Sequence, residues 1–325
     1  MSQTTVISAE QASWVAEVFS AAVDNVERVI HGKRRVVELV FATALAGGHV
    51  LLEDVPGTGK TALARALSAT VDGTSSRIQF TPDLLPGDVT GITVFDQRRA
   101  AFEFHPGPIF ANVVLADEIN RASPKTQSAL LEVMEEGRVT VDRVSHEVPS
   151  PFLVLATQNP IEQAGTYRLP EAQLDRFMIK TSVGYPDHAA MMRILQGAGT
   201  PEETLRAVLS TERMAQAASL ARTAHVSPLI ADYILRIVDA TRAAAEVRLG
   251  ASVRGALALT RLAATWAAVQ GRTFVVPDDV RELASTVLAH RLVLEPEAEF
   301  DGVTAEDVLI QVLLDVPVPE ETGAA

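Results

Sequence analysis

The 325-residue sequence contains no cysteine, and only 5% of its residues are aromatic. The lack of cysteine excludes disulfides, zinc ribbons and thiol nucleophiles, but it does not identify a compartment. Long apolar runs are also missing, because Glu38 and His49 interrupt the apolar stretch from Val36 to Leu52. Residues Met1–Glu10 contain no basic segment followed by an apolar run, as a secretory signal would. We therefore expect a soluble, cytoplasmic protein without membrane insertion.

Positive charge is scarce, with 28 Lys and Arg against 41 Asp and Glu, which gives a formal net charge of −13. This balance weighs against a protein that binds the phosphate backbone of nucleic acids, although a local basic patch could still bind them. The 47% share of hydrophobic residues is enough for a large core. The length fits one large domain or two smaller ones, and we expect two.

Short apolar runs, with helical patterns between most of them, are typical of buried parallel strands and predict an α/β sheet. Upstream of them, the spacing of apolar residues over Ile7–Arg35 predicts a helix that ends in a turn at His31-Gly32, and a second helix is expected over Val36–Ala46. The five predicted strands are Val50–Leu52, Ile78–Phe80, Val113–Leu115, Phe152–Leu155 and Ile179–Val183.

The composition changes at Tyr185-Pro186-Asp187, where Asp187 can cap a helix. Beyond this point the sequence has a helical period and no convincing strand, with helix starts indicated at Ser227-Pro228 and Val276-Pro277. We therefore predict an α/β domain over residues 1–185 and a helical domain over residues 186–325, with a frayed tail from Asp315.

The segment 54–61 reads DVPGTGKT and lies between an apolar strand and the strong helix formers of Ala62–Leu67. Strand, glycine loop, Lys-Thr and helix together are the context of a phosphate-binding loop, in which backbone N–H groups and the helix N-terminus face phosphate oxygens. Lys60 would reach the β- and γ-phosphates of ATP, and the Thr61 hydroxyl would bind Mg²⁺. The predicted nucleotide-binding residues are Val55, Pro56, Gly57, Thr58, Gly59, Lys60, Thr61 and Ala62.

Asp54 stands where this pattern usually has its first glycine. A carboxylate aimed at phosphates would repel them, so we expect the Asp54 side chain to face away and to bond within the turn. A glycine-rich turn with an incidental Lys-Thr pair is the alternative interpretation, and the flanking strand and helix argue against it.

Two other predicted strands end in polar side chains. Asp117 and Glu118 follow the strand at Val113, where Asp117 would hold Mg²⁺ and Glu118 would polarise the water that attacks the γ-phosphate. Asn159 follows the strand at Phe152 and could orient that water or bond the γ-phosphate. The alternatives are a solvated strand edge for the two acids and an Asn-Pro turn for Asn159.

Four motifs, in this order along the chain, resemble those of MoxR-type AAA+ ATPases. They are DVPGTGKT at 54–61, ADEINRASPKTQ at 116–127, ATQNP at 156–160 and LPEAQLDRF at 169–177, and the resemblance extends over about Val29–His290. It implies a five-stranded parallel AAA+ core with its N-terminal helix over residues 1–185 and an all-helical lid over 186–325. It also implies ATP in the crevice between them, and assembly as a homo-oligomeric ring, usually hexameric.

The same resemblance assigns roles to two arginines. Arg176 would act as a finger that reaches into the neighbouring subunit's site, and Arg254 would be the lid sensor that touches the γ-phosphate in its own subunit. Both roles agree with the ability of a guanidinium to neutralise charge on the transferring phosphoryl group. A surface salt bridge is the alternative for Arg176.

Two hairpins are predicted, one from Ile92–Phe95 with Ala101–Phe104 and one from Gly137–Arg143 with Ser145–Val148. The first fits the clade of this family that carries an insert in its second helix. In related rings such hairpins face the central pore or the partner, and a simple packing role is the alternative.

The resemblance implies ATP hydrolysis coupled to the remodelling, activation, or metal or cofactor loading of a client protein, together with a partner that bears a von Willebrand A (VWA) domain. A slow nucleotide-switched scaffold is one alternative, and Glu118, Asn159 and Arg176 argue against it. A nucleic-acid-associated AAA+ motor is another, and the net negative charge and the absence of an added DNA-binding module weigh against it.

Overall fold

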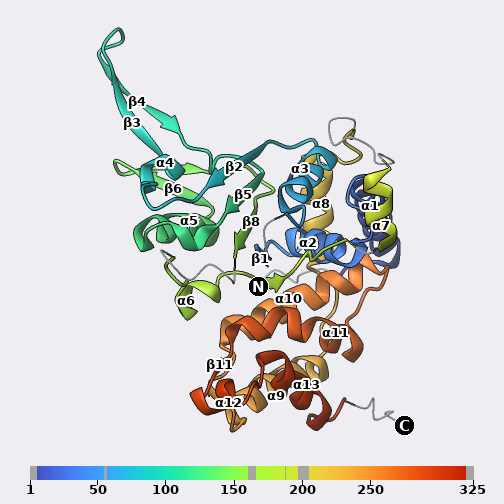
Figure 1. The fold of residues 1–325 in the computed structure, drawn as a ribbon. Coiled ribbons are helices and arrows are strands. Elements are labelled where there is room, and N and C mark those ends of the chain that lie inside the picture. The colour runs from blue at the N-terminus through green and yellow to red at the C-terminus, as the bar shows by residue number, and fades with distance from the viewer. Residues whose placement is uncertain (1–5, 55–56, 160–165, 187, 197–204, 320–325) are drawn as a thin grey trace. The chain divides into compact units, whose positions relative to one another are not determined.

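The computed structural model describes residues 6–54, 57–159, 166–186, 188–196 and 205–319. Five parallel strands form one sheet in the order β2-β5-β8-β1-β9 (Figure 1), as the sequence predicted. Leu155 of β8 lies opposite both Val50 of β1 and Leu115 of β5, so these three strands end at the same edge of the sheet. The strands are β1 Val50–Glu53, β2 Ser75–Gln79, β5 Val113–Asp117, β8 Leu153–Gln158 and β9 Ile179–Thr181.

Both faces of this sheet are covered, which explains why the strands read as continuous apolar runs. Helix α5 (Pro124–Glu136) lies on one face, and α2 (Arg34–Leu45) and α3 (Lys60–Thr70) lie on the other (Figure 1). On the α5 face, Val114 and Val154 are fully buried in one cluster with Leu130 and Leu131. Full burial of such a side chain contributes about 1.5–3 kcal/mol.

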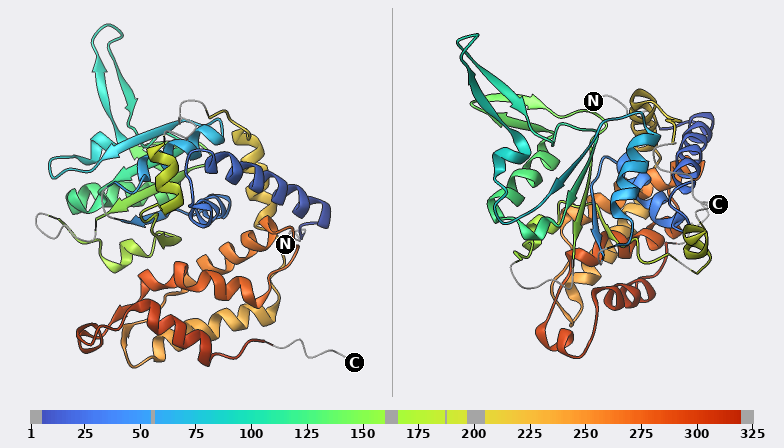
Figure 2. Two further views of the ribbon diagram at one scale, coloured as in Figure 1. Left: turned by 45° about the vertical axis from the view of Figure 1, so that its right-hand side comes forward. Right: turned by 45° about the horizontal axis from the view of Figure 1, so that its top comes forward.

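The two predicted hairpins are confirmed. Strands β3 (Gly91–Asp96) and β4 (Ala101–Pro106) pair antiparallel after the short helix α4 (Pro86–Thr90), and β6 (Arg138–Val141) pairs with β7 (Val144–Glu147). The β3–β4 hairpin projects away from the sheet in both views of Figure 2. Phe104 of β4 stacks on His146 of β7 at 4.0 Å between ring centroids, so the two hairpins are in contact.

The N-terminal helices α1 (Ala9–Glu27) and α2 agree with the predicted pair. Ser227 caps α9 as expected, because its hydroxyl accepts the Ile230 N–H at 3.2 Å. Pro228 occupies the first helical position. Asp187, the predicted cap at the start of the next segment, lies outside the described residues. The remaining α-helices of the described ranges are α6 Glu171–Leu174, α7 His188–Leu195, α8 Thr211–Ala221, α9 Pro228–Ala243, α10 Val253–Val269, α11 Pro277–Leu288, α12 Pro296–Phe300 and α13 Ala305–Asp315.

The C-terminal part is not entirely helical, which corrects the prediction of no strand beyond Pro186. Strands β10 (Val247–Leu249) and β11 (Val293–Leu294) form a short antiparallel ribbon with an irregular register. Segments of three and two residues are too short to show the alternation by which a strand is recognised in a sequence. Around this ribbon, α10 packs against α9 and α11, and α13 packs against α9 and α11.

The chain divides into two compact units, and each is described separately. One comprises Met1–Ser20, Met178–Lys180 and Gln216–Ala325, and the other comprises Ala21–Phe177 and Thr181–Ala215. The division falls within α1, β9 and α8, so the chain passes between the units at these elements. A domain boundary near Pro186 stays a prediction.

In the part of the chain that the structure describes, none of the helices is both long enough and apolar enough to cross a bilayer.

Candidate functional site

The loop between β1 and α3 has the backbone that a glycine-rich sequence permits. Gly57 and Gly59 have φ values of +86° and +88°, in the left-handed region that favours glycine. Gly59 is the N-cap of α3 and offers no side-chain cap, and the first turn of any helix has N–H groups without intrahelical partners. The loop therefore leads into a helix N-terminus suited to an anion. Val55 and Pro56, two of the predicted binding residues, lie outside the described residues.

A cavity of about 300 Å³ opens beside this loop. It unites residues from the β1–α3 loop with the carboxyl ends of three strands, as expected for ligand sites in open α/β sheets. The predicted residues Gly57–Thr61, Asp117, Glu118 and Asn159 all line it. The other lining residues are Arg77, Gln79, Thr157 and Gln158.

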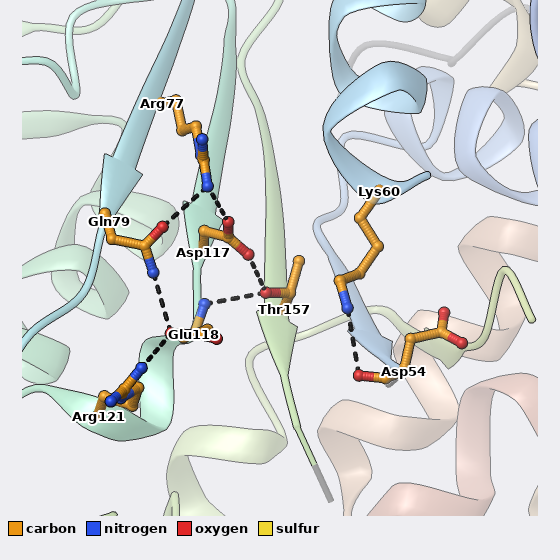
Figure 3. A network of polar contacts seen from close by, with 8 residues as sticks. All are labelled: Asp54, Lys60, Arg77, Gln79, Asp117, Glu118, Arg121 and Thr157. Atoms are coloured by element: carbon orange, nitrogen blue, oxygen red, sulfur yellow. Dashed lines mark hydrogen bonds and ion pairs between the residues drawn. The ribbon is translucent and has the colours of Figure 1, made fainter. Parts of the chain in front are cut away.

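Asp117, at the end of β5, is held from two sides (Figure 3). Its Oδ1 accepts the Thr157 hydroxyl at 2.7 Å, and its Oδ2 lies 2.7 Å from Nη2 of Arg77. A carboxylate has about four acceptor positions, so these two bonds leave it capacity for a further ligand. Asp117 is thus a buried carboxylate with a fixed orientation and a positive neighbour.

Glu118 follows directly and adopts φ +56° and ψ +50°, an uncommon conformation for a residue other than glycine. Its N–H donates to the Thr157 hydroxyl oxygen at 2.9 Å. Its Oε2 accepts from Gln79 Nε2 at 3.0 Å and from Arg121 Nη1 at 2.8 Å (Figure 3). The left-handed backbone at Glu118 is therefore fixed by a bond to β8 and by two side-chain bonds.

Lys60 and Asp54 meet at the other side of the loop. Nζ of Lys60 donates to the backbone carbonyl of Asp54 at 3.2 Å. The Asp54 carboxylate faces away from the cavity, as predicted, but its partners are not in the turn. They are the N–H groups of Val183 and Gly184, at 2.5 and 3.0 Å. These partners lie 129 and 130 residues away in the chain, so no local sequence pattern points to them.

Arg77 and Gln79 are site residues that the sequence analysis missed. Both are on β2, two positions apart, and therefore project from the same face of the strand, while Ile78 between them is buried. Parallel pairing sets Gln79 opposite Asp117. The available signal was the pair of polar residues on either side of the apolar Ile78. Placing them at the site requires knowing that β2 neighbours β5.

Among the predicted residues that the structure describes, three do not line the cavity. Ala62 lies in the first turn of α3, and Arg176 forms an ion pair with Glu135 of α5, at 3.1 Å between Nη2 and Oε2. Arg254 is an exposed residue in the first turn of α10, in the other compact unit. Their predicted roles stay predictions.

Comparison with known proteins places this geometry in a family. Residues 49–179 match the family described as "ATPase family associated with various cellular activities (AAA)", and residues 239–312 match the "AAA lid domain". The chain is 43% identical over 308 residues to the protein named Chaperone MoxR1 of Mycobacterium tuberculosis, with 92% of this chain and 82% of that protein covered. The chain belongs to the MoxR family of AAA+ ATPases. This confirms the resemblance that the four motifs indicated.

Two other similarities extend over nearly the whole MoxR-family chain. It is 48% identical over 305 residues to YeaC of Bacillus subtilis, described as uncharacterized, with 93% of this chain and 95% of that protein covered. A crystal structure from Cytophaga hutchinsonii, assigned provisionally as an ATPase, has a TM-score of 0.89 at 36% identity and covers 96% of this chain and 98% of that one. The AAA+ core and lid are therefore the fold of this chain.

Proposed function

We propose that this MoxR-family chain binds ATP in the cavity beside Gly57–Thr61 and hydrolyses its γ-phosphate. The observation that supports this most directly is that the glycine loop and the acidic pair Asp117-Glu118 line one cavity. Backbone N–H groups of the loop and of the α3 N-terminus would hold phosphate oxygens, with Lys60 Nζ as the cation for the β- and γ-phosphates. Val55, Pro56 and Ala62 complete the proposed nucleotide-binding segment.

The chemistry of the donor set fits Mg²⁺. The Thr61 hydroxyl and the Asp117 carboxylate are oxygen donors, which this ion prefers. Arg77 holds Asp117 Oδ2 at 2.7 Å, so Mg²⁺ would use the remaining acceptor positions of this carboxylate. When bound, Mg²⁺ would neutralise charge on the β- and γ-phosphate oxygens. Thr61 and Asp117 are the residues that would hold it.

Glu118 is the proposed general base. Its carboxylate would accept a proton from a water molecule while the water oxygen attacks the γ-phosphorus. The bond from the γ-phosphorus to the β,γ-bridging oxygen would break, which releases ADP. Asn159 would orient this water or bond the γ-phosphate, because an amide donates and accepts without carrying charge. Both residues line the cavity with the phosphate loop.

The remaining two arginines are proposed to complete the site in an assembly. Arg176 would reach the site of a neighbouring subunit in a homo-oligomeric, hexameric ring, and Arg254 would sense the γ-phosphate from the lid of its own subunit. A guanidinium can stabilise negative charge on the transferring phosphoryl group in either position. That Arg176 does not line the cavity of its own chain is compatible with a role in trans.

We also propose that ATP turnover drives the remodelling, activation, or metal or cofactor loading of a client protein, with a VWA-domain partner. The name Chaperone MoxR1 of the relative from Mycobacterium tuberculosis supports the chaperone class. On this chain, the β3–β4 hairpin offers an apolar contact for a client, because Phe95 and Phe102 form an edge-on pair at 5.2 Å and are 49% and 75% exposed.

Phosphate release from ATP in the presence of Mg²⁺ tests the proposal. Wild-type protein should release phosphate, Lys60→Ala should bind nucleotide weakly, and Glu118→Gln should bind ATP but lose nearly all turnover, by about 100-fold or more. Glu132→Gln, an exposed residue of α5 with the same change of charge, is the matched control and should keep wild-type activity. Equal turnover by wild type and Glu118→Gln would exclude Glu118 as the base, and absence of nucleotide binding by wild type would exclude the function itself.

A further inference from the structure

Asp54 connects three parts of its compact unit through separate groups. Its N–H donates to the carbonyl of Gln158 at 3.2 Å, and its carbonyl accepts Nζ of Lys60 at 3.2 Å. Its carboxylate accepts the N–H groups of Val183 and Gly184 at 2.5 and 3.0 Å. Figure 3 shows the carbonyl oxygen on the side of Lys60 and the carboxylate turned the other way.

This carboxylate is buried, since Asp54 is only 6% exposed. A buried carboxylate persists where hydrogen bonds satisfy its charge, and the partners of Asp54 are two consecutive backbone N–H groups. Asp54 stands at the usual first-glycine position of the loop pattern. Glycine there could supply the same N–H and carbonyl, but it has no side chain to bond Val183 and Gly184. The carboxylate therefore adds a connection that glycine could not make.

The segment that Asp54 holds is also bonded from its other side. Nζ of Lys33, the residue before α2, donates to the carbonyl of Tyr185 at 2.7 Å. Gly184 has φ +65°, which favours glycine and lets the chain turn between these two contacts. Val183, Gly184 and Tyr185 thus each bond a side chain. This segment directly follows β9, where the chain passes from one compact unit to the other.

We propose that Asp54 is a positioning residue that couples nucleotide occupancy of the phosphate loop to the Val183–Tyr185 segment. The inference rests on the proposed function, because it requires a phosphate in the cavity. A bound phosphate would draw Nζ of Lys60 towards the cavity, and so away from the Asp54 carbonyl, because a charged oxygen attracts the ammonium group more strongly than a carbonyl does. A shift of Asp54 after loss of that bond moves the carboxylate that holds Val183 and Gly184.

The substitution Asp54→Gly breaks the link between the phosphate loop and the Val183–Tyr185 segment. It keeps the backbone N–H and carbonyl that face Gln158 and Lys60, and it removes only the carboxylate. Tyr185 is 65% exposed and uses its backbone carbonyl for the bond to Lys33, so Tyr185→Trp provides a fluorescent reporter on the segment. The parent protein, whose tryptophans are Trp14 and Trp266, gives the background signal.

Tyr185→Trp protein is titrated with ADP and Mg²⁺, and binding of a fluorescent ADP derivative is measured in parallel. We expect the emission of the introduced indole to change on saturation, and we expect Asp54→Gly to reduce that change about threefold or more while the variant still binds the fluorescent ADP. The control Asp72→Asn removes one exposed carboxylate from the same unit and should leave the signal unchanged. If Asp54→Gly does not fold, as judged by circular dichroism, Asp54→Asn replaces it and should also reduce the signal.

The outcomes separate the inference from the function on which it rests. If even the reporter protein that retains Asp54 does not bind ADP, the proposed function is overturned, and the coupling is overturned with it. Normal binding with equal emission changes in the presence and absence of the Asp54 carboxylate overturns the coupling alone. Normal binding without any emission change in the Asp54-containing reporter also overturns the coupling.

Discussion

Thr157 donates its hydroxyl to Asp117 Oδ1 at 2.7 Å. The same hydroxyl oxygen accepts the N–H of Glu118 at 2.9 Å, and Thr157 is only 1% exposed. One side chain of β8 thereby fixes the carboxylate proposed to hold the metal and the backbone of the proposed base. The orientation of the acidic pair depends on the neighbouring strand as much as on β5 itself.

Replacing Thr157 should impair hydrolysis without removing any group that contacts the nucleotide in our proposal. Thr157→Val keeps the shape but leaves the Glu118 N–H without its acceptor, so we expect kcat to fall about tenfold or more and stability to fall by about 1–3 kcal/mol. Phosphate-release kinetics and urea unfolding measure the two effects. Thr157→Ser retains the hydroxyl and should recover most of the activity. Equal kcat for the valine and serine variants would show that the hydroxyl has no part in turnover.

Gln79 and Arg121 both donate to Oε2 of Glu118 and so occupy an oxygen that the proposed base would use to accept a proton from water. Gln79→Ala removes one donor, so we expect basal ATP turnover to rise about threefold at saturating ATP. Steady-state phosphate release measures this. Gln79→Glu places a second carboxylate beside Glu118 and should lower turnover instead. A fall in turnover with Gln79→Ala would mean that this bond positions Glu118 for attack rather than restraining it.

The sequence predicts the centre of this site but not its periphery. Gly57–Thr61, Asp117 and Asn159 were found because the carboxyl ends of parallel strands meet at one edge, so each motif could be placed from its own strand. Arg77 could not be found in this way, because its relation to Asp117 depends on the pairing of β2 with β5.

The fold shows the same limit. The five core strands were recognisable as apolar runs, whereas the partners of Asp54 depend on a contact across 129 residues of chain. The β10–β11 ribbon escaped prediction because two or three residues carry no period. Local patterns therefore predict the longer helices and strands, whereas hydrogen bonds between residues distant in sequence are seen only in the structure.

Arg176 allows a test of the proposed ring. Arg176→Ala should abolish most ATP turnover, and mixing it with Lys60→Ala should restore part of that turnover, because a Lys60→Ala subunit still offers its own Arg176 to a neighbour. Phosphate release at a series of mixing ratios measures the recovery. Glu135→Gln is the matched control, since it removes the ion pair of Arg176 while keeping the guanidinium. If Glu135→Gln lost as much activity as Arg176→Ala and mixing restored none, the role of Arg176 would be its salt bridge within the chain, and a role in a neighbouring subunit would be excluded.

His49 makes the stability of the AAA+ core sensitive to acid. Its ring is buried, with Nε2 3.0 Å from the Met134 carbonyl and Nδ1 accepting the Val154 N–H at 3.0 Å, and burial lowers its pKa from 6.5 to about 4. Because the folded-state pKa lies below the unfolded value, the neutral ring stabilises the fold above pH 6.5. That contribution is lost as the pH falls from 6.5 towards 4. Between pH 7 and pH 5 the loss should be about 2 kcal/mol.

Urea unfolding at pH 7 and pH 5 measures this loss, and His49→Gln is the variant that isolates it. Glutamine can still donate to the Met134 carbonyl but does not titrate, so the variant should be less stable at pH 7 yet lose about 2 kcal/mol less than wild type on acidification. Other groups titrate equally in both proteins, so they cancel in the comparison. The same pH dependence in wild type and His49→Gln would mean that His49 is protonated in the folded core without cost, in conflict with the hydrogen bond it accepts from Val154.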